Sequence, residues 1–205
     1  MENDTYKTII KSSEEVLHKD KNSKFFSYAF PISIEDDIKQ HLEDLKQQHP
    51  KAGHFCYAYQ IGKEKTTIAY RANDDGEPSN SAGLPIYGQI QSFEVTDILV
   101  VVVRYFGGVK LGVGGLINAY RTGAQLALEA SKIVELTINI DYIITCDYEV
   151  INKVMRVIKE KNLNIIDQKL ELDCQITISV RKKDAEKIYS IFESIYKVTI
   201  KKTDY

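Results

Sequence analysis

The chain has 205 residues, of which 43% are hydrophobic, and its 27 basic and 29 acidic side chains leave a formal net charge of -2. These values are ordinary for a globular protein with one medium domain or two small ones, and they argue against a strongly basic nucleic-acid-binding module. The longest wholly apolar run, residues 98–103, is too short to span a bilayer. The first residues also lack the basic end and apolar core of a signal peptide, so we expect a cytoplasmic protein with no membrane partner.

The first two thirds of the chain alternate between strand and helix patterns. Apolar runs predict strands at residues 5–11, 24–30, 56–61, 66–71 and 97–104. Helical spacing predicts one helix that is capped by Ser33 and ends before Pro50, a short helix over residues 82–92, and a third helix over residues 115–131. The third helix has a face of small residues around Gly123, which suits close packing against a sheet.

The pattern after residue 135 is more regular. Alternating apolar residues predict strands at residues 138–146, 163–170, 172–180 and 198–200. Helical stripes cover residues 151–158 and 185–192, so the order βαββαβ is that of the ferredoxin-like split motif. We therefore predict an α+β protein with two domains, residues 1–133 and residues 134–205.

The three cysteines do not indicate a metal site. Cys56, Cys146 and Cys174 form an odd set without the spacing of zinc ligands. We expect reduced, buried thiols, no disulfide framework, no bound metal and no other cofactor.

A cluster of glycines follows the apolar strand. The segment from Arg104 reads RYFGGVKLGVGG and contains Gly107, Gly108, Gly112, Gly114 and Gly115. A strand, a glycine loop and a helix N-terminus in this order direct free N–H groups toward an anion or another backbone. The alternative is that the glycines only permit a tight turn and close packing of the helix on the sheet. Residue chemistry alone leaves both interpretations open.

Two nucleotide-binding motifs are absent from this loop. A phosphate-binding loop needs Gly-Lys followed by Ser or Thr, whereas Gly108 is followed by Val109, Lys110 and Leu111. The dinucleotide fingerprint lacks its third glycine, because leucine, isoleucine and asparagine follow Gly115. The sequence therefore excludes a nucleotide-hydrolysing site, including that of a GTPase, and a Rossmann cofactor site.

A second unusual segment, residues 73–85, combines turn-forming residues with the carboxylates of Asp74, Asp75 and Glu77. Adjacent aspartates usually point to different sides, so we favour turn capping and pairing with Arg71, Arg104 or Lys110 over binding of a hard cation. Our hypothesis is that Arg104, Lys110 and the N–H groups of residues 112–115 form the positive side of a binding surface. The three carboxylates then order the facing loop.

These segments resemble the signature of the YigZ/IMPACT family of conserved cytoplasmic proteins. The resemblance is carried by residues 74–86, DDGEPSNSAGLPI, by residues 100–120, VVVVRYFGGVKLGVGGLINAY, and by residues 54–59, HFCYAY. The rest of the chain is similar to the small C-terminal domain of bacterial members. The chain departs from the family pattern at Asn80-Ser81, where Gly-Thr is usual, at Phe55, where Asn is usual, and at Asn118, where Arg is usual. The last departure removes a candidate anion contact.

The family resemblance implies an Impact N-terminal domain followed by a small C-terminal domain. The first resembles the β/α fold of translational GTPase domain IV and related ribosomal proteins, and the second resembles domain V of elongation factor G. Eukaryotic relatives are linked to translational control through a stress-kinase pathway, by binding an activator protein. No firmly assigned catalytic reaction comes with the family.

Two weaker candidates complete the sequence analysis. His54 and Cys56 share one face of a strand and could form a nucleophile and its base, but no third orienting residue is evident. Arg181, Lys182, Lys183 and Lys187 could contact RNA, although lysines near helix ends are usually solvated.

The favoured function is a non-enzymatic, translation-associated regulatory module that binds RNA, the ribosome or a regulatory protein. The alternative is an enzyme or binding protein for a phosphorylated small molecule at the glycine-rich loop. The sequence leaves the oligomeric state open.

Overall fold

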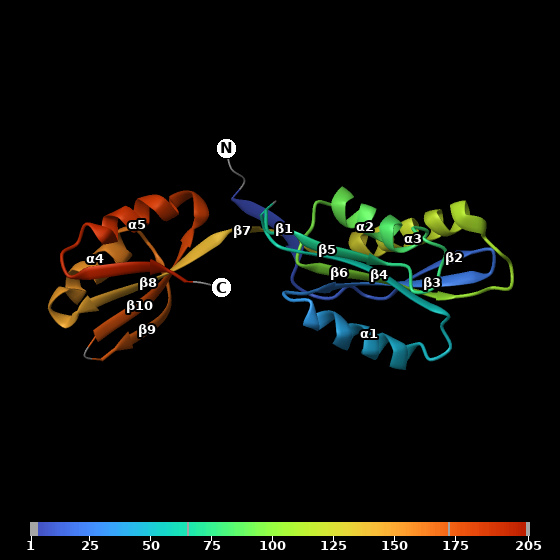
Figure 1. Cartoon of the computed structure of the whole chain (residues 1–205), viewed down its shortest axis with the longest axis horizontal. Helices are drawn as coiled ribbons and strands as arrows, with labels where there is room; N and C mark the ends of the chain where they lie inside the picture. Colours follow the sequence, from blue (N-terminus) through green and yellow to red (C-terminus); the bar gives the residue numbers. More distant parts are fainter. Residues whose placement is uncertain (1–3, 65, 172, 204–205) are drawn as a thin grey trace. The chain divides into compact units, whose positions relative to one another are not determined.

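The computed structural model describes residues 4–64, 66–171 and 173–203, and it shows the predicted mixture of helices and strands (Figure 1). The chain divides into two compact units. The larger unit is Tyr6–Leu136, and the smaller one joins the N-terminal residues up to Thr5 to the residues from Thr137 onward.

The larger unit is built on a five-stranded antiparallel sheet with the order β2-β3-β6-β4-β5. Its strands are β2 (Val16–Asp20), β3 (Ser23–Pro31), β4 (His54–Ile61), β5 (Ala69–Asn73) and β6 (Ile98–Tyr105). Helix α1 (Asp36–Gln48) covers one face, while α2 (Gly83–Ser92) and α3 (Gly112–Glu129) cover the other (Figure 1). Strands β1 (Thr5–Ile9) and β7 (Ile133–Thr137) form a separate two-stranded sheet.

The central strand β6 is buried on both faces because helices cover both sides of the sheet. Val100 and Val102 belong to the core beneath α2 and α3, whereas Leu99, Val101 and Val103 belong to the core beneath α1. Successive side chains of a strand point to opposite faces, so a strand between two helical layers has no solvent-exposed face. This position explains the continuous apolar run in the sequence.

Helix α3 approaches the sheet closely at Gly123, as its small-residue face predicts. A Cβ atom on Gly123 would lie 2.6 Å from Ser27 Oγ and 3.3 Å from a methyl carbon of Val102. A larger residue would displace the Ser27 side chain or push the helix away from β3 and β6. The packing thus offsets the low helix propensity of glycine.

Several element boundaries differ from the predictions. Ser33 does not cap α1; instead Asp37 Oδ2 accepts hydrogen bonds from the backbone N–H groups of Ser33 and Ile34, at 2.8 and 3.2 Å. Helix α3 begins at Gly112, three residues earlier than expected. The sequence pattern missed β2 and β7, which are short strands with few buried residues.

The smaller unit has the predicted order of elements. Its strands are β8 (Asn139–Asp147), β9 (Asn164–Leu170), β10 (Asp173–Arg181) and β11 (Val198–Lys202), and its helices are α4 (Ile151–Glu160) and α5 (Ala185–Glu193). The antiparallel sheet has the order β11-β8-β10-β9. Side chains of both helices pack with Ile144, Ile176 and Ile178 in one core. The opposite face of the sheet presents polar residues such as Gln175 and Thr177, which alternate with the buried residues of β10.

Candidate functional site

The turn between β5 and α2 uses its two aspartates as backbone caps. Asp74 Oδ1 accepts hydrogen bonds from the N–H groups of Ala82 and Gly83, at 2.9 and 2.8 Å, and Asp74 Oδ2 accepts one from Asn80 at 2.8 Å. Asp75 Oδ2 accepts a hydrogen bond from a backbone N–H on β4, at 2.6 Å. Asp74 therefore orders the turn and the start of α2, as the capping interpretation predicts, while Asp75 attaches the turn to β4.

Glu77, the third carboxylate, lies in the protein interior beside Arg104. Their side chains are only 4% and 6% exposed, and Arg104 Nη1 donates to Glu77 Oε1 at 2.5 Å. The same oxygen accepts a hydrogen bond from the Tyr120 hydroxyl at 2.7 Å. The guanidinium also lies 5.6 Å from the ring centroids of Phe25 and Phe106. We call Glu77, Arg104 and Tyr120 the buried polar cluster.

The buried polar cluster shows that the predicted binding surface is wrong at Arg104. Arg104 pairs with Glu77, which is one of the pairings that the sequence predicts. The charge of Arg104 is, however, buried and neutralised. It cannot form the positive side of an exposed surface together with Lys110. Arg71 and Lys110 make none of the ion pairs found among the residues that the structure describes.

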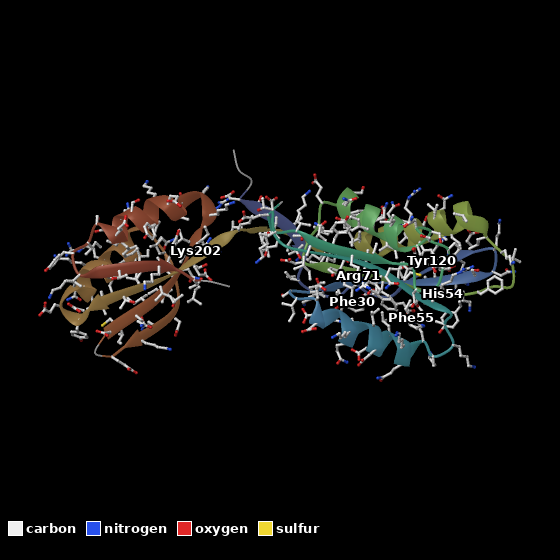
Figure 2. All side chains as sticks on the ribbon, viewed as in Figure 1. Phe30, His54, Phe55, Arg71, Tyr120 and Lys202 are labelled. Atoms are coloured by element: carbon white, nitrogen blue, oxygen red, sulfur yellow. The ribbon has the colours of Figure 1, made fainter. Side chains whose placement is uncertain are left out.

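His54 and Cys56 extend the cluster along β4; Figure 2 labels His54 and Tyr120. His54 Nδ1 hydrogen-bonds to the backbone carbonyl of Asp75 at 2.8 Å, and the Cys56 thiol donates to that of Asp74 at 3.0 Å. Both carbonyls belong to the turn between β5 and α2, which we call the acidic turn. His54 Nε2 lies 3.9 Å from the carboxylate of Glu77. Burial is the main cause that raises the pKa of the Cys56 thiol and of the Tyr120 hydroxyl above their usual range. A neutral, fully buried thiol is not an activated nucleophile.

Sequence reasoning did not place Tyr120 in this cluster. The spacing of α3 carries a usable signal, because Tyr120 lies on the same helical face as Gly123, Ala124 and Ala127. A tyrosine on a buried face needs an acceptor for its hydroxyl. The acceptor itself comes from a turn that is 43 residues away in the sequence, which periodicity does not reveal.

The glycine segment consists of a turn followed by the first turn of α3. At Gly107, a Cβ atom would lie 2.0 Å from the carbonyl carbon of Asn22, so only glycine allows this approach to the β2–β3 turn. Gly112, Gly114 and Gly115 belong to the helix and not to a loop. The N-cap residue Leu111 provides no side-chain hydrogen bond.

An exposed surface surrounds the start of α3. Phe106, Val109 and Val113 are 57%, 46% and 55% exposed. Lys110 is exposed between them and has no hydrogen-bond or ion-pair partner within the described part of the chain. We call these four side chains the loop surface. Of the cations predicted for the site, Lys110 is the one that this surface presents to solvent.

A second polar network lies beneath α1. The Tyr28 hydroxyl donates to Glu15 and is also 2.5 Å from His49 Nε2, while His49 Nδ1 is 3.1 Å from the Tyr105 hydroxyl. Because the single Tyr28 proton points to Glu15, His49 Nε2 must donate to Tyr28, which leaves Nδ1 to accept from Tyr105. Burial lowers the pKa of His49, against the nearby charge of Glu15, and so favours the neutral ring.

The basic residues predicted for RNA contact are only partly available. Arg181 donates to both carboxylate oxygens of Asp4, at 2.5 and 3.1 Å, so its charge is already paired. Lys182 is half-buried, whereas Lys183, just before α5, and Lys187, in its first turn, are exposed. These positions do not form a groove of unpaired cations.

The departures from the family pattern have clear structural settings. Phe55 packs in the core beneath α1, and Asn80 adopts a left-handed backbone with φ 62°. Ser81 is buried and donates to the Pro78 carbonyl at 2.6 Å. Asn118 is exposed on α3, where Arg121 donates to it at 3.4 Å.

Metal and membrane sites are not evident. Among the described residues, no group of three or more His, Cys, Asp or Glu side chains is arranged to hold a metal ion. All three cysteines are buried and unbridged. No described helix combines the length and the apolar character needed to span a membrane.

Comparison with known proteins first defines the class of the larger unit, since residues 21–128 match the model of the Impact N-terminal domain. The chain is 32% identical over 169 residues to an IMPACT family member of Haemophilus influenzae, and the match covers 81% of each protein. The chain therefore belongs to the IMPACT family.

Two solved structures are also similar. One, described as a hypothetical protein, superposes with a TM-score of 0.74 at 24% identity and covers 98% of both chains, which shows that the fold is shared. The other, the two-domain translational regulator Yih1, has a TM-score of 0.40 at 26% identity and covers 59% of this chain and 46% of that chain.

Proposed function

We propose that this chain is a non-enzymatic, cytoplasmic, translation-associated regulatory module that binds a partner through the loop surface. Support comes from membership of the IMPACT family, because the family resemblance links its eukaryotic members to translational control. The observation that carries the proposal is the exposure of Phe106, Val109 and Val113 around an unpaired Lys110. Large apolar side chains that gather on a surface mark interaction sites.

The composition of the loop surface favours a protein surface as the partner, either a regulatory protein or a ribosomal protein. Binding to a phosphate backbone draws its affinity from several cations, whereas the loop surface has one lysine. Interface cores are enriched in aromatic and other apolar side chains, and the loop surface offers these. RNA contact is therefore the less favoured version of the proposal.

The proposal includes a division into domains at residues 1–133 and 134–205. The larger domain then corresponds to the β/α fold of translational GTPase domain IV. The smaller domain, with its βαββαβ order, is then a ferredoxin-like fold that corresponds to domain V of elongation factor G. Such a pairing fits a protein that acts on the translation apparatus, but fold by itself does not determine function.

Most residues proposed for the alternative, a site for a phosphorylated small molecule, have other partners in the structure. Asp74 and Asp75 bind backbone N–H groups, and Arg104 is paired with Glu77 inside the protein. Lys110 and the backbone N–H groups at the start of α3 would be left to bind the phosphate. No observation favours this function over partner binding.

Co-sedimentation with ribosomes over a series of salt concentrations tests the proposal. Lys110→Glu and Val113→Ser change the loop surface without touching the core. Their matched controls are Lys46→Glu and Ile34→Ser, which alter exposed side chains on and before α1. Arg104 is unsuitable as a test position because it is buried.

We expect the two loop variants to lose retention and the two controls to keep it. Retention that persists at high salt indicates an apolar protein contact, whereas a steep decline indicates phosphate contacts. If the native protein is not retained at any salt concentration, or if all four variants bind like it, the ribosome is not a partner at this surface.

A further inference from the structure

Strand β5 is an exposed edge of the five-stranded sheet. It lies at the end of the strand order, beside β4, and every residue from 66 to 71 is exposed. In an antiparallel sheet, every second residue of an edge strand directs its N–H and C=O groups away from the sheet. None of the turn and loop hydrogen bonds of the described residues uses a backbone group of β5. The edge is thus free to pair with another strand along residues 69–71, whereas the start of α2 packs against the backbone of Ala72 and Asn73.

An apolar strip follows this edge on the side of α2. The Tyr70 ring stacks on the Tyr87 ring, with centroids 4.4 Å apart and planes 9° apart. Tyr70 is 57% exposed, while Tyr87 beneath it is 8% exposed. Leu84 lies one turn before Tyr87 and is 46% exposed, and a Cβ on Gly88 would meet no atom within 4 Å. Apolar side chains of an added strand would contact the apolar surface that Tyr70, Tyr87 and Leu84 already form here.

The other side of the edge carries the cation of Arg71. Arg71 follows Tyr70 and so points to the opposite face, where its cross-strand neighbour Tyr59 packs beneath α1. Figure 2 labels Arg71 on this strand. Arg71 is exposed and takes part in none of the ion pairs of the described residues. An added strand therefore meets an unpaired cation on this side.

The opposite edge of the same sheet differs. Strand β2 carries Lys19 and Asp20, charges of both signs next to each other. Charged side chains on an edge strand discourage pairing with another chain. Strand β5 has a single charge, Arg71, beside exposed apolar residues.

We propose that β5 binds an extended segment of a partner protein as an additional strand. Residues of that segment opposite Tyr70 are apolar and lie on the Tyr70–Leu84 strip, and those opposite Arg71 are acidic. The backbone provides hydrogen bonds, and the two faces of the strand select an alternating apolar and acidic sequence. This site is separate from the loop surface, so a test of strand binding at β5 does not depend on the proposed function.

A peptide of alternating valine and glutamate, titrated into isotopically labelled full chain and followed by NMR, tests the proposal. We expect amide signals to move in β5 and at the start of α2. Arg71→Glu should weaken binding of this peptide about tenfold and favour a peptide of alternating valine and lysine. The control Lys19→Glu makes the same charge change on β2 and should leave both affinities unchanged.

Three outcomes would overturn the proposal. The first is that neither peptide moves the β5 signals. The second is that Arg71→Glu and Lys19→Glu have equal effects, since the selectivity then does not come from β5. The third is a concentration-dependent dimer in which β5 amides are protected without peptide, because the occupant of the edge is then a second copy of the chain.

Discussion

Replacement of Glu77 by glutamine should be one of the most damaging isosteric changes in the larger unit. Glu77→Gln keeps an oxygen that can accept the Tyr120 hydroxyl, 2.7 Å away, but removes the charge that balances Arg104. The guanidinium stays buried, and its Nε already has no hydrogen-bond partner among the described residues. The variant therefore isolates the effect of an uncompensated buried cation.

The expected cost follows from the burial of the pair. With side chains 4% and 6% exposed, water cannot solvate the remaining charge. Breaking a buried ion pair from one side costs about 3–5 kcal/mol, whereas replacing both partners by apolar groups is often neutral. Since a domain is stable by about 5–15 kcal/mol, the single variant loses a large part of its stability. Glu77→Gln/Arg104→Met should recover much of that loss.

Urea unfolding followed by circular dichroism measures these changes, and hydrogen exchange of the β6 amides assigns the transition to the larger unit. The control is Glu94→Gln, which breaks the exposed pair with Lys7 and should change the midpoint little. If Glu77→Gln costs no more than the control, or if the double variant is less stable than the single one, the buried charge is not what makes Glu77 important.

Three further predictions concern the glycines, the acidic turn and the response to pH. Gly107→Ala should lower the melting temperature strongly, at a cost of about 1–3 kcal/mol or more, because its Cβ would overlap Asn22. Gly114→Ala has open space and should raise stability by up to about 1 kcal/mol. Equal melting temperatures of the two variants would contradict this prediction. Asp74→Ala should cost about 1–2 kcal/mol in urea unfolding through the lost N-terminal cap of α2, and an unchanged midpoint would show that other groups cap the helix. Because burial lowers the pKa of His49 from 6.5, the unfolded state binds the proton more readily, so stability is complete above about pH 6.5 and declines as the pH falls toward the folded pKa. His49→Gln should reduce that decline between about pH 7 and pH 5, and an identical decline would assign it to other groups.

Strong periodic patterns allowed much of the fold to be predicted. The apolar run of β6 and the alternation in β8 and β10 reflect burial directly, so these strands were found with small boundary errors. Strand β2 was missed because its sequence, VLHKD, has no alternation that marks a buried face. The start of α3 was misplaced because glycine has a low helix propensity, whereas Gly112 begins the helix with a left-handed backbone, φ 73°, that glycine adopts readily.

The candidate site was predictable only in part. Local capping by Asp74 follows from turn chemistry, since carboxylates in turns bind nearby N–H groups. The pairing of Glu77 with Arg104 was one of several open choices. These residues are 27 positions apart and approach only through the order of the strands, which a single sequence does not specify. Sequence likewise could not show that Arg104 is buried while Lys110 is exposed.

The bond between Asp4 and Arg181 has a consequence for how the chain is made and divided. The two residues are 177 positions apart, yet both belong to the smaller unit. During synthesis, Asp4 is made 177 residues before Arg181, so this bond cannot form until the larger unit has been made. A fragment cut at Thr137 would expose Arg181 without its carboxylate and leave Ile138 without the backbone acceptor at Asp4. The smaller unit is thus completed by residues that precede the larger unit in the chain.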